Sequence, residues 1–422
     1  MQNLKNRYPQ QDAQRRRSDA QALTKEKTEI DAQASKVGEL AFLSIFEEIL
    51  VADPTSIAFN GALNKHHMQA IWTWIIRDIA PDLNQIIKDA KNEQEAKKAI
   101  ISYCPSLVKI ISKEIALASE KSTVNNRLTA QLGGEEVKQR LTIFLVVLRC
   151  HALLSKASSF GKASNSIEDE TALGTALQSM PLQEPSVVAF LFQIIVGRSN
   201  NPSNLILAAA KIIGASSEGA MQRAGFEPLL DALLSHAQNQ ASLLSGQKGL
   251  YIDADLMCKS IYRFHKLMHA ASGYVELERR SRLGKAATEI TLQMAQIVEP
   301  RLKEVSSDVS QSLRKPRRGE DKIDADGLLA ALNGIYLLAA VREAKESLAL
   351  NALFDRIWSE TGKNLEILLD RNLEEFKKDT NNSIVSQRLD MGIKMAKIRF
   401  GEEYAGILQN AKDKVSRRSN EA

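Results

Sequence analysis

Four reactive side chains fall on one side of a stretch that the sequence predicts to be a helix, residues 252–276. At about 100° per residue, Cys258, Tyr262, His265 and His269 lie within an arc of roughly 60°. Two histidines one turn apart can share a metal ion, and a thiol can act as a ligand or a nucleophile. This side of the helix is therefore the first candidate for chemistry.

The spacing of the four side chains limits that chemistry. Cys258 lies about 16 Å along the helix axis from His269, whereas the bonds from zinc to its ligands are only about 2.0–2.3 Å long. His265 and His269 remain as an incomplete metal pair, because the H-E-x-x-H pattern is absent. The sequence favours the alternative, a helix edge that packs on another helix with its histidines hydrogen-bonded. We expect no bound metal and no cofactor.

Two basic clusters could bind an anion or a nucleic acid. Their members are Arg279, Arg280 and Arg282 in the first, and Arg314, Lys315, Arg317 and Arg318 in the second. Acidic residues interleave with the first cluster and directly follow the second, which is typical of a solvated, ion-paired surface. No aromatic residue lies among these arginines to stack on a base. The seven residues are therefore candidate anion-binding residues, and nucleic-acid binding is not favoured.

The tetrapeptide Ile-Asp-Ala-Asp occurs twice, at residues 252–255 and 323–326, which are 71 residues apart. Aspartate is a good N-cap, because its carboxylate accepts a free backbone N–H and its charge suits the start of a helix. The echo indicates either two related helical units or one capping solution used twice. Capping is favoured, since no consensus of a known helical repeat accompanies the echo.

The composition indicates an all-α protein. Hydrophobic residues make up 44% of the chain and charged residues 25%, which is the range of ordinary folded proteins. Ala, Leu, Ile, Lys, Glu and Gln dominate, and we find no convincing alternation of β-branched and aromatic residues. The Ala- and Leu-rich helical style also suggests a bacterial protein. We expect a multi-helix bundle or an irregular helical array in two to three lobes.

Charge, cysteines and hydropathy indicate the compartment. The net charge is +5, but residues 1–18 carry +4 and residues 412–422 carry +2, which leaves −1 for the body. The three scattered cysteines argue for a reducing cytosol. The sequence shows no signal peptide, and its longest apolar stretches, residues 187–196 and 328–341, fall short of the roughly 20 residues that span a bilayer. We therefore expect a cytoplasmic protein without an integral membrane segment.

The pattern of apolar and polar stretches predicts six regions. They are a mobile basic and polar tail (1–35), an N-terminal helical domain (36–157), a polar linker (158–185), a central helical domain (186–305), a basic and acidic loop (306–324) and a C-terminal helical domain (325–416). The tail could serve as an address for export by a non-classical route or as an arm for an acidic partner.

No nucleotide-binding loop, hydrolase elbow or paired-cysteine metal signature occurs in the chain, so a non-enzymatic function is favoured. The leading hypothesis is a helical scaffold, adaptor or assembly protein that acts through protein–protein contacts, with self-association as one form of them. The second is a nucleic-acid- or anion-binding helical protein resembling a nucleoprotein in kind. The third is a secreted bacterial effector or a component of a secretion system.

Overall fold

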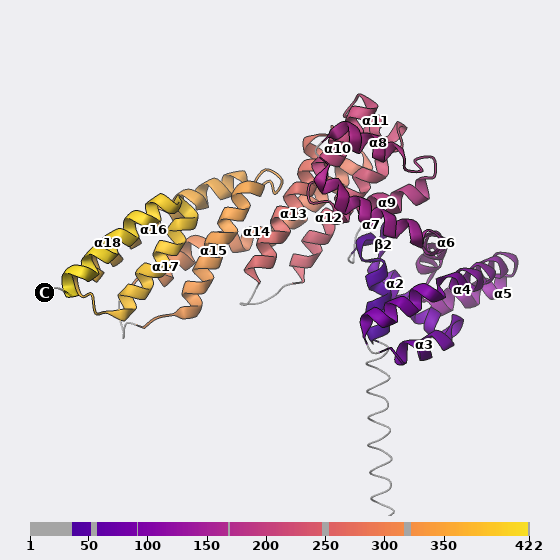
Figure 1. Ribbon diagram of the computed structural model, residues 1–422, viewed down its shortest axis with the longest axis horizontal. Helices are drawn as coiled ribbons and strands as arrows, with labels where there is room; N and C mark the ends of the chain where they lie inside the picture. Colours follow the sequence, from indigo (N-terminus) through magenta and orange to yellow (C-terminus); the bar gives the residue numbers. More distant parts are fainter. Residues whose placement is uncertain are drawn as a thin grey trace, which may run out of the picture. The chain divides into compact units, whose positions relative to one another are not determined.

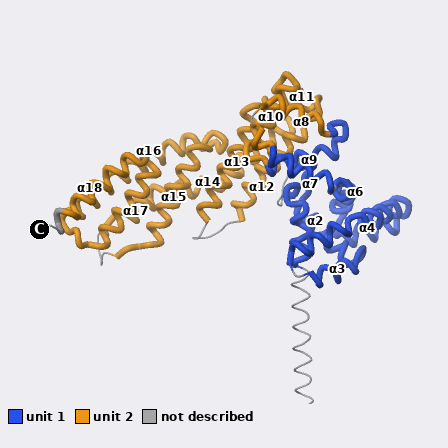
Figure 2. The backbone as a smooth tube through the Cα atoms, in the orientation of Figure 1, with its two compact units in different colours: residues 1–163, 181–198 blue, residues 164–180, 199–422 orange. Residues whose placement is uncertain are grey.

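The computed structural model describes residues 36–51, 57–90, 92–167, 169–246, 253–315 and 322–420. Almost all of these residues are helical, which confirms the all-α prediction; the extended elements among them are a short parallel pair, β1 (Leu50–Val51) and β2 (Leu63–Asn64), and an isolated parallel bridge between Ser217 and Glu276. The predicted tail, residues 1–35, lies outside the described part. The chain forms two compact units (Figure 2): unit 1 comprises residues 1–163 and 181–198, and unit 2 comprises residues 164–180 and 199–422.

Unit 1 is a group of helices packed around an aromatic core. Residues 36–45 are helical and are followed by η1 (Glu47–Ile49), the two strands, α2 (Lys65–Trp74), η2 (Ile75–Ile79, a π-helix), α3 (Pro81–Lys88), α4 (Glu93–Glu120), α5 (Ser122–Leu132), α6 (Glu135–Arg149), α7 (His151–Ala163) and α9 (Pro185–Arg198). Phe42 stacks on Trp72 with ring centroids 4.7 Å apart, and Phe46 and Phe144 lie edge-on at 5.9 Å. These rings join the first helix, α2 and α6.

Helix α9 is the most deeply buried element of unit 1. Residues 187–196 are all buried, and α9 packs against η1, α6 and α7. Gly61 is required beside it, because its φ is 76° and a Cβ would lie only 2.4 Å from the backbone carbonyl of Ala189. The hydrophobic run that the sequence shows here is therefore a core helix.

Unit 2 begins with η3 (Ser164–Ser166), α8 (Glu170–Gln178), α10 (Pro202–Ile213) and α11 (Glu218–Arg223), and continues as three helical hairpins and a last helix. The hairpins are α12 (Glu227–Ser245) with α13 (Ala254–Gly273), α14 (Arg282–Ser312) with α15 (Ala325–Ala344), and α16 (Asn351–Lys378) with α17 (Ser383–Phe400); α18 (Glu402–Asn420) follows. α12, α14, α16 and α18 pack in that order as one layer, and α13, α15 and α17 pack as the other (Figure 1). Unit 2 is thus a stacked array of hairpins.

The Ile-Asp-Ala-Asp echo marks equivalent helices of this array. Asp253 caps α13 and Asp324 caps α15, and these are the second helices of two successive hairpins. Five pairs of positions 71 residues apart are buried in both helices: 257 and 328, 260 and 331, 264 and 335, 267 and 338, and 270 and 341. The capping that the sequence favours is present, and it recurs at the same place in a repeated supersecondary unit.

Helix α15 is both long and apolar. Among the described residues it is the single helix that is long and apolar enough to cross a membrane, with a mean hydropathy of 1.3; the α6–α7 region would add a second only if that bent pair were one span. The helix is longer than its apolar run in the sequence, 328–341, suggests. α15 packs on α13, α14, α16 and α17, and 39% of its apolar window is buried.

Two predicted connections contain helices. The region 158–185 includes the end of α7, η3 and α8, and α14 extends to Ser312, past the predicted break at residue 306. The sequence predicted a basic and acidic loop from residue 306, but Val305 and Val309 are buried at helical spacing and α14 continues through them. The predicted domain boundaries remain predictions.

Candidate functional site

The face of α13 that carries the reactive residues lies beside the end of α15. Its apolar neighbour face is buried, as its spacing predicts: Met257, Ile261, Phe264, Leu267, Met268 and Ala271. Nδ1 of His265 lies 2.9 Å from Oγ of Ser347, in the turn between α15 and α16. The His265 and His269 rings are stacked with centroids 5.7 Å apart, and His269 lies edge-on to Tyr274 at 5.1 Å. This is a helix edge with a histidine hydrogen-bonded at the boundary.

The electrostatics of this face do not favour nucleophilic chemistry. Burial, followed by the charge of Asp255, raises the pKa of the Cys258 thiol above its usual range. Burial, followed by the neighbouring His269, lowers the pKa of His265. A raised thiol pKa keeps the sulfur protonated at neutral pH, whereas a nucleophilic cysteine needs a lowered one. In the described part of the chain, no group of three His, Cys, Asp or Glu side chains is arranged to hold a metal ion.

A second cluster lies further along the array and was not predicted. The guanidinium of Arg399, on α17, lies 3.6 Å from the centroid of the Trp358 ring, on α16, and donates a hydrogen bond to the Trp358 carbonyl at 3.0 Å. Arg342, at the end of α15, lies 5.3 Å from the same ring. The Phe400 ring contacts Arg399 at 4.9 Å and the Tyr404 ring at 4.8 Å. Five residues from four helices therefore form one aromatic and cationic group.

The two clusters are neighbours. Helix α13 packs along α15, and His265 of α13 bonds Ser347, five residues after Arg342. The pKa of Tyr262 is raised chiefly by burial; the charges of Cys258 and Glu343 raise it further and that of Arg342 opposes them. We call the combined set the aromatic–arginine strip; its members are Tyr262, His265, His269, Tyr274, Arg342, Trp358, Arg399, Phe400 and Tyr404. Tyr262 is 40% exposed and the Arg342 side chain 49% exposed, so the strip is open to solvent at its middle.

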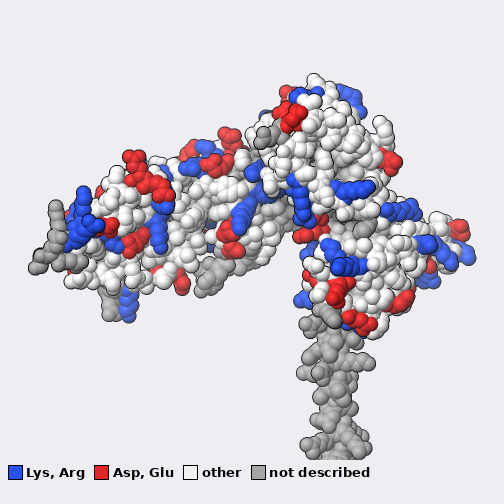
Figure 3. Space-filling model, in the orientation of Figure 1, with Lys and Arg blue, Asp and Glu red and all other residues white. Residues whose placement is uncertain are grey.

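The charges in and around the strip are balanced. Arg342 Nε pairs with Glu343 at 3.0 Å, Lys345 pairs with Asp355 at 3.2 Å, and Lys397 pairs with Glu402 at 2.8 Å. Burial lowers the pKa of Arg399, and the carboxylate of Glu366 opposes that effect. Figure 3 shows the same mixture over the visible face, where basic and acidic side chains interleave.

The predicted anion-binding residues have different surroundings. Arg279 and Arg280 are exposed in the turn before α14. Arg282 instead forms a two-pronged ion pair with Asp231 at 2.6 and 2.9 Å and a third contact with Glu227 at 2.8 Å. The guanidinium of Arg282 is therefore engaged by carboxylates of α12.

The second basic cluster lies at the other end of α14. Arg314 and Lys315 are exposed just after the helix ends. Arg317 and Arg318 lie outside the described residues.

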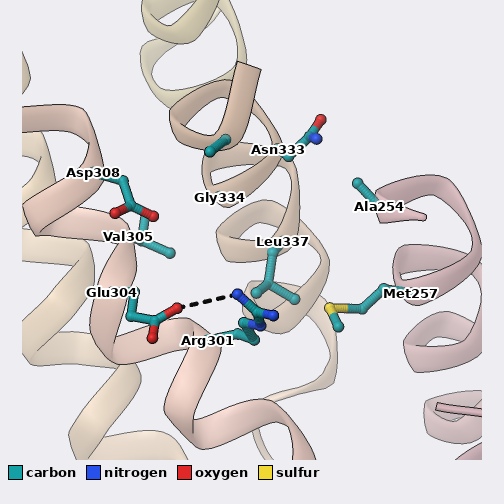
Figure 4. Close-up of a pocket in the computed structure, with 10 residues that line it drawn as sticks. Ala254, Met257, Arg301, Glu304, Val305, Asp308, Asn333, Gly334 and Leu337 are labelled. Atoms are coloured by element: carbon teal, nitrogen blue, oxygen red, sulfur yellow. Dashed lines mark hydrogen bonds and ion pairs between the residues drawn. The ribbon is translucent and has the colours of Figure 1, made fainter. Parts of the chain in front are cut away.

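A small pocket between α13, α14 and α15 has a polar wall (Figure 4). Its volume is about 90 Å³, and Met257, Leu337 and Gly334 line it together with Asp308 and Asn333. Arg301 and Glu304, which form an ion pair at 3.3 Å, complete the polar side. Burial and the neighbouring Glu304 raise the pKa of Asp308. The pocket is smaller than the roughly 300–1,000 Å³ of ligand-binding sites.

Comparison with protein families, curated proteins and solved structures gives no match to this chain. The candidate site therefore stands on geometry. Sequence reasoning located Tyr262, His265 and His269 but missed Arg342, Trp358 and Arg399, which are separated by 16 and 41 residues. The available signal was a lone tryptophan two turns into α16 and an arginine followed by phenylalanine at the end of α17.

Proposed function

We propose that this protein is a helical scaffold that binds a protein partner through the aromatic–arginine strip. The observation that carries the proposal is the strip itself, to which α13, α15, α16, α17 and α18 contribute tyrosine, histidine, tryptophan and arginine side chains. Tryptophan, tyrosine and arginine are the residue types enriched where protein partners gain most of their binding energy. Stacked helical hairpins commonly use such extended surfaces for binding.

The charge balance favours a protein partner over a nucleic acid. Binding to a phosphate backbone needs unpaired cations, because affinity comes from neutralised phosphates and released counterions. In the strip, Arg342 is paired with Glu343, and one side of Trp358 is occupied by Arg399, which stands where a base would stack. A nucleic acid would have to displace both contacts.

The same geometry supports a non-enzymatic function. The Cys258 thiol has a raised pKa, and the His265 ring is held by Ser347 and stacked on His269. Both features suit a packed helix edge. We place the protein in the cytoplasm on its cysteine content; export by a non-classical route predicts that deletion of residues 1–35 abolishes export and leaves folding intact.

The first experiment is size exclusion with light scattering on the purified full chain, at low and high salt, with absorbance at 260 and 280 nm. A protein spectrum with a salt-independent mass, as an oligomer or with a bound protein, supports the scaffold. An elevated 260/280 ratio that collapses at high salt would transfer support to the nucleic-acid hypothesis.

A photo-cross-linking experiment then tests the surface. A photoreactive amino acid replaces Tyr262 in the strip or, as the control, Leu292, which is 58% exposed on α14 in the other layer. The proposal predicts a discrete protein adduct at Tyr262 that is absent at Leu292 and is reduced by Arg399→Ala. Equal adducts at both positions would contradict a partner site at the strip.

A further inference from the structure

A second pocket of unit 2 lies at the end of α14 and carries unpaired positive charge. Its volume is about 270 Å³, and its lining residues are Leu313, Arg314, Lys315, Leu368, Arg371, Asn372 and Glu375. A single water molecule needs only about 10–15 Å³ of comparable space. The pocket therefore has room for a small polyatomic ion together with water.

Three cations line this pocket against a single carboxylate. Arg314, Lys315 and Arg371 are exposed, and none of them forms an ion pair or a hydrogen bond within the described part of the chain. This differs from Arg282, Arg342 and Arg399, each of which is engaged by a neighbour. Counting Glu375, the lining carries a net charge of about +2.

The pocket wall is held in place by Asn372. This side chain is 4% exposed, and its Nδ2 donates to the carbonyl of Leu313 at 3.0 Å and to that of Leu368 at 2.8 Å. The first bond ties the end of α14 to α16 and positions the backbone that carries Arg314. It also covers a carbonyl at the helix C-terminus, where the helix dipole would otherwise repel an anion.

We propose that this pocket binds a phosphate-class dianion, either free or as the phosphoryl group of a larger molecule. Guanidinium groups match the geometry of phosphate oxygens with paired N–H donors, and a lysine adds a point charge. Three like charges around one pocket raise the free energy of the empty site, and a dianion bound there lowers that repulsion. The site is separate from the aromatic–arginine strip, because Trp358 and Arg371 lie about 20 Å apart along α16.

The test is titration calorimetry on the full chain with inorganic phosphate, at constant ionic strength maintained with chloride. We expect saturable binding that weakens at least tenfold in the Arg314→Gln/Arg371→Gln variant. The matched control is Arg279→Gln/Arg280→Gln, which removes two exposed arginines elsewhere and should bind as the parent does. O-phosphoserine serves as the second ligand: tighter binding than inorganic phosphate identifies a phosphoryl group on a larger molecule, and weaker binding identifies the free ion.

Two results would overturn the proposal. One is the absence of saturable phosphate binding by the parent chain, and the other is an equal loss of binding in the control variant, which would indicate net charge alone. Circular dichroism checks that each variant is folded. If the double variant does not fold, Lys315→Gln replaces it, since Lys315 is exposed and forms no hydrogen bond or ion pair with a described residue.

Discussion

The guanidinium carbon of Arg399 lies 3.6 Å from the centroid of the Trp358 ring, and the same guanidinium donates a hydrogen bond to the backbone carbonyl of Trp358. One side chain of α17 is thereby fixed to both the side chain and the main chain of α16. A contact of this kind joins the two helices of a hairpin at their open end. It also fixes the arginine at the centre of the aromatic–arginine strip.

Replacement of Arg399 by alanine should lower the free energy of unfolding by about 1–3 kcal/mol. A cation–π contact contributes about 0.5–2 kcal/mol and a hydrogen bond about 1 kcal/mol. Urea unfolding monitored by circular dichroism measures the change. Arg356→Ala is the control, because Arg356 is exposed on α16 and forms no hydrogen bond, ion pair or ring contact with a described residue; equal losses in the two variants would disprove the role of the stack.

Replacement of Arg282 by alanine should destabilise the chain by about 2–3 kcal/mol. The Asp231 side chain is 0% exposed, and removal of its partner leaves a buried carboxylate without its main counter-ion. The effect is smaller than for a fully buried pair, because the Arg282 side chain is 41% exposed. The neighbouring exposed Arg280→Ala should change stability by less than about 0.5 kcal/mol. Thermal unfolding of both variants provides the comparison.

Stability should decrease as the pH falls below about 6.5, the ordinary pKa of histidine. Burial lowers the pKa of His265 in the folded state, with His269 and Lys266 acting in the same direction and Glu343 and Glu346 against them. Below about pH 6.5 the unfolded chain binds a proton that folded His265 does not, so protonation favours unfolding. The stability contributed by neutral His265 is fully present above the pKa of this histidine in the unfolded chain, and it is lost as the pH falls towards its pKa in the folded state.

This dependence is measured as the urea midpoint at pH 7.5 and 5.5. The His265→Gln variant should show a smaller difference between the two midpoints than the parent chain. His66→Gln is the control, since His66 is exposed on α2 in unit 1 and is not among the groups that act on His265. An unchanged difference in His265→Gln would rule out this histidine as the source.

Loss of either aspartate cap should destabilise its helix by about 1 kcal/mol. Asp253 accepts hydrogen bonds from the backbone N–H groups of Asp255 and Leu256, and Asp324 accepts one from Gly327. Asp253→Ala and Asp324→Ala should therefore have similar effects, and the double variant should show roughly their sum. Denaturant unfolding of the three variants tests this, with Asp→Asn at each site as the control that keeps a capping side chain.

The helical class and much of the helix interior followed from the sequence because each depends on local spacing. The buried face of α13 and the caps at Asp253 and Asp324 are examples, since hydrophobic periodicity and capping act within a few residues. The neighbours of a helix edge could not be predicted in the same way. Whether Arg399 contacts Trp358 depends on how α16 and α17 are aligned, and that alignment cannot be predicted from a sequence separation of 41 residues.

The candidate sites likewise combine features that local sequence predicts with features that only tertiary packing decides. The predicted anion-binding residue Arg282 turned out to be held by Asp231, which lies 51 positions earlier on another helix. Arg314 and Lys315 line a pocket because tertiary packing brings Arg371 of α16 to the same place. Composition identified basic residues, but the pairing of each with an acid or a pocket was decided by tertiary packing.

The stacking of hairpins in unit 2 has a mechanical consequence. Each hairpin is supported mainly by its neighbours in the row, and among the described helices α18 packs mainly on α17 and on α16. Local unfolding should therefore begin at α18 and proceed towards α14, and hydrogen exchange should show protection rising in the same direction. The first step would carry away Arg399, Phe400 and Tyr404 together. A partner bound across the strip would hold α15, α16, α17 and α18 together, so binding of the partner would also stabilise this part of the array.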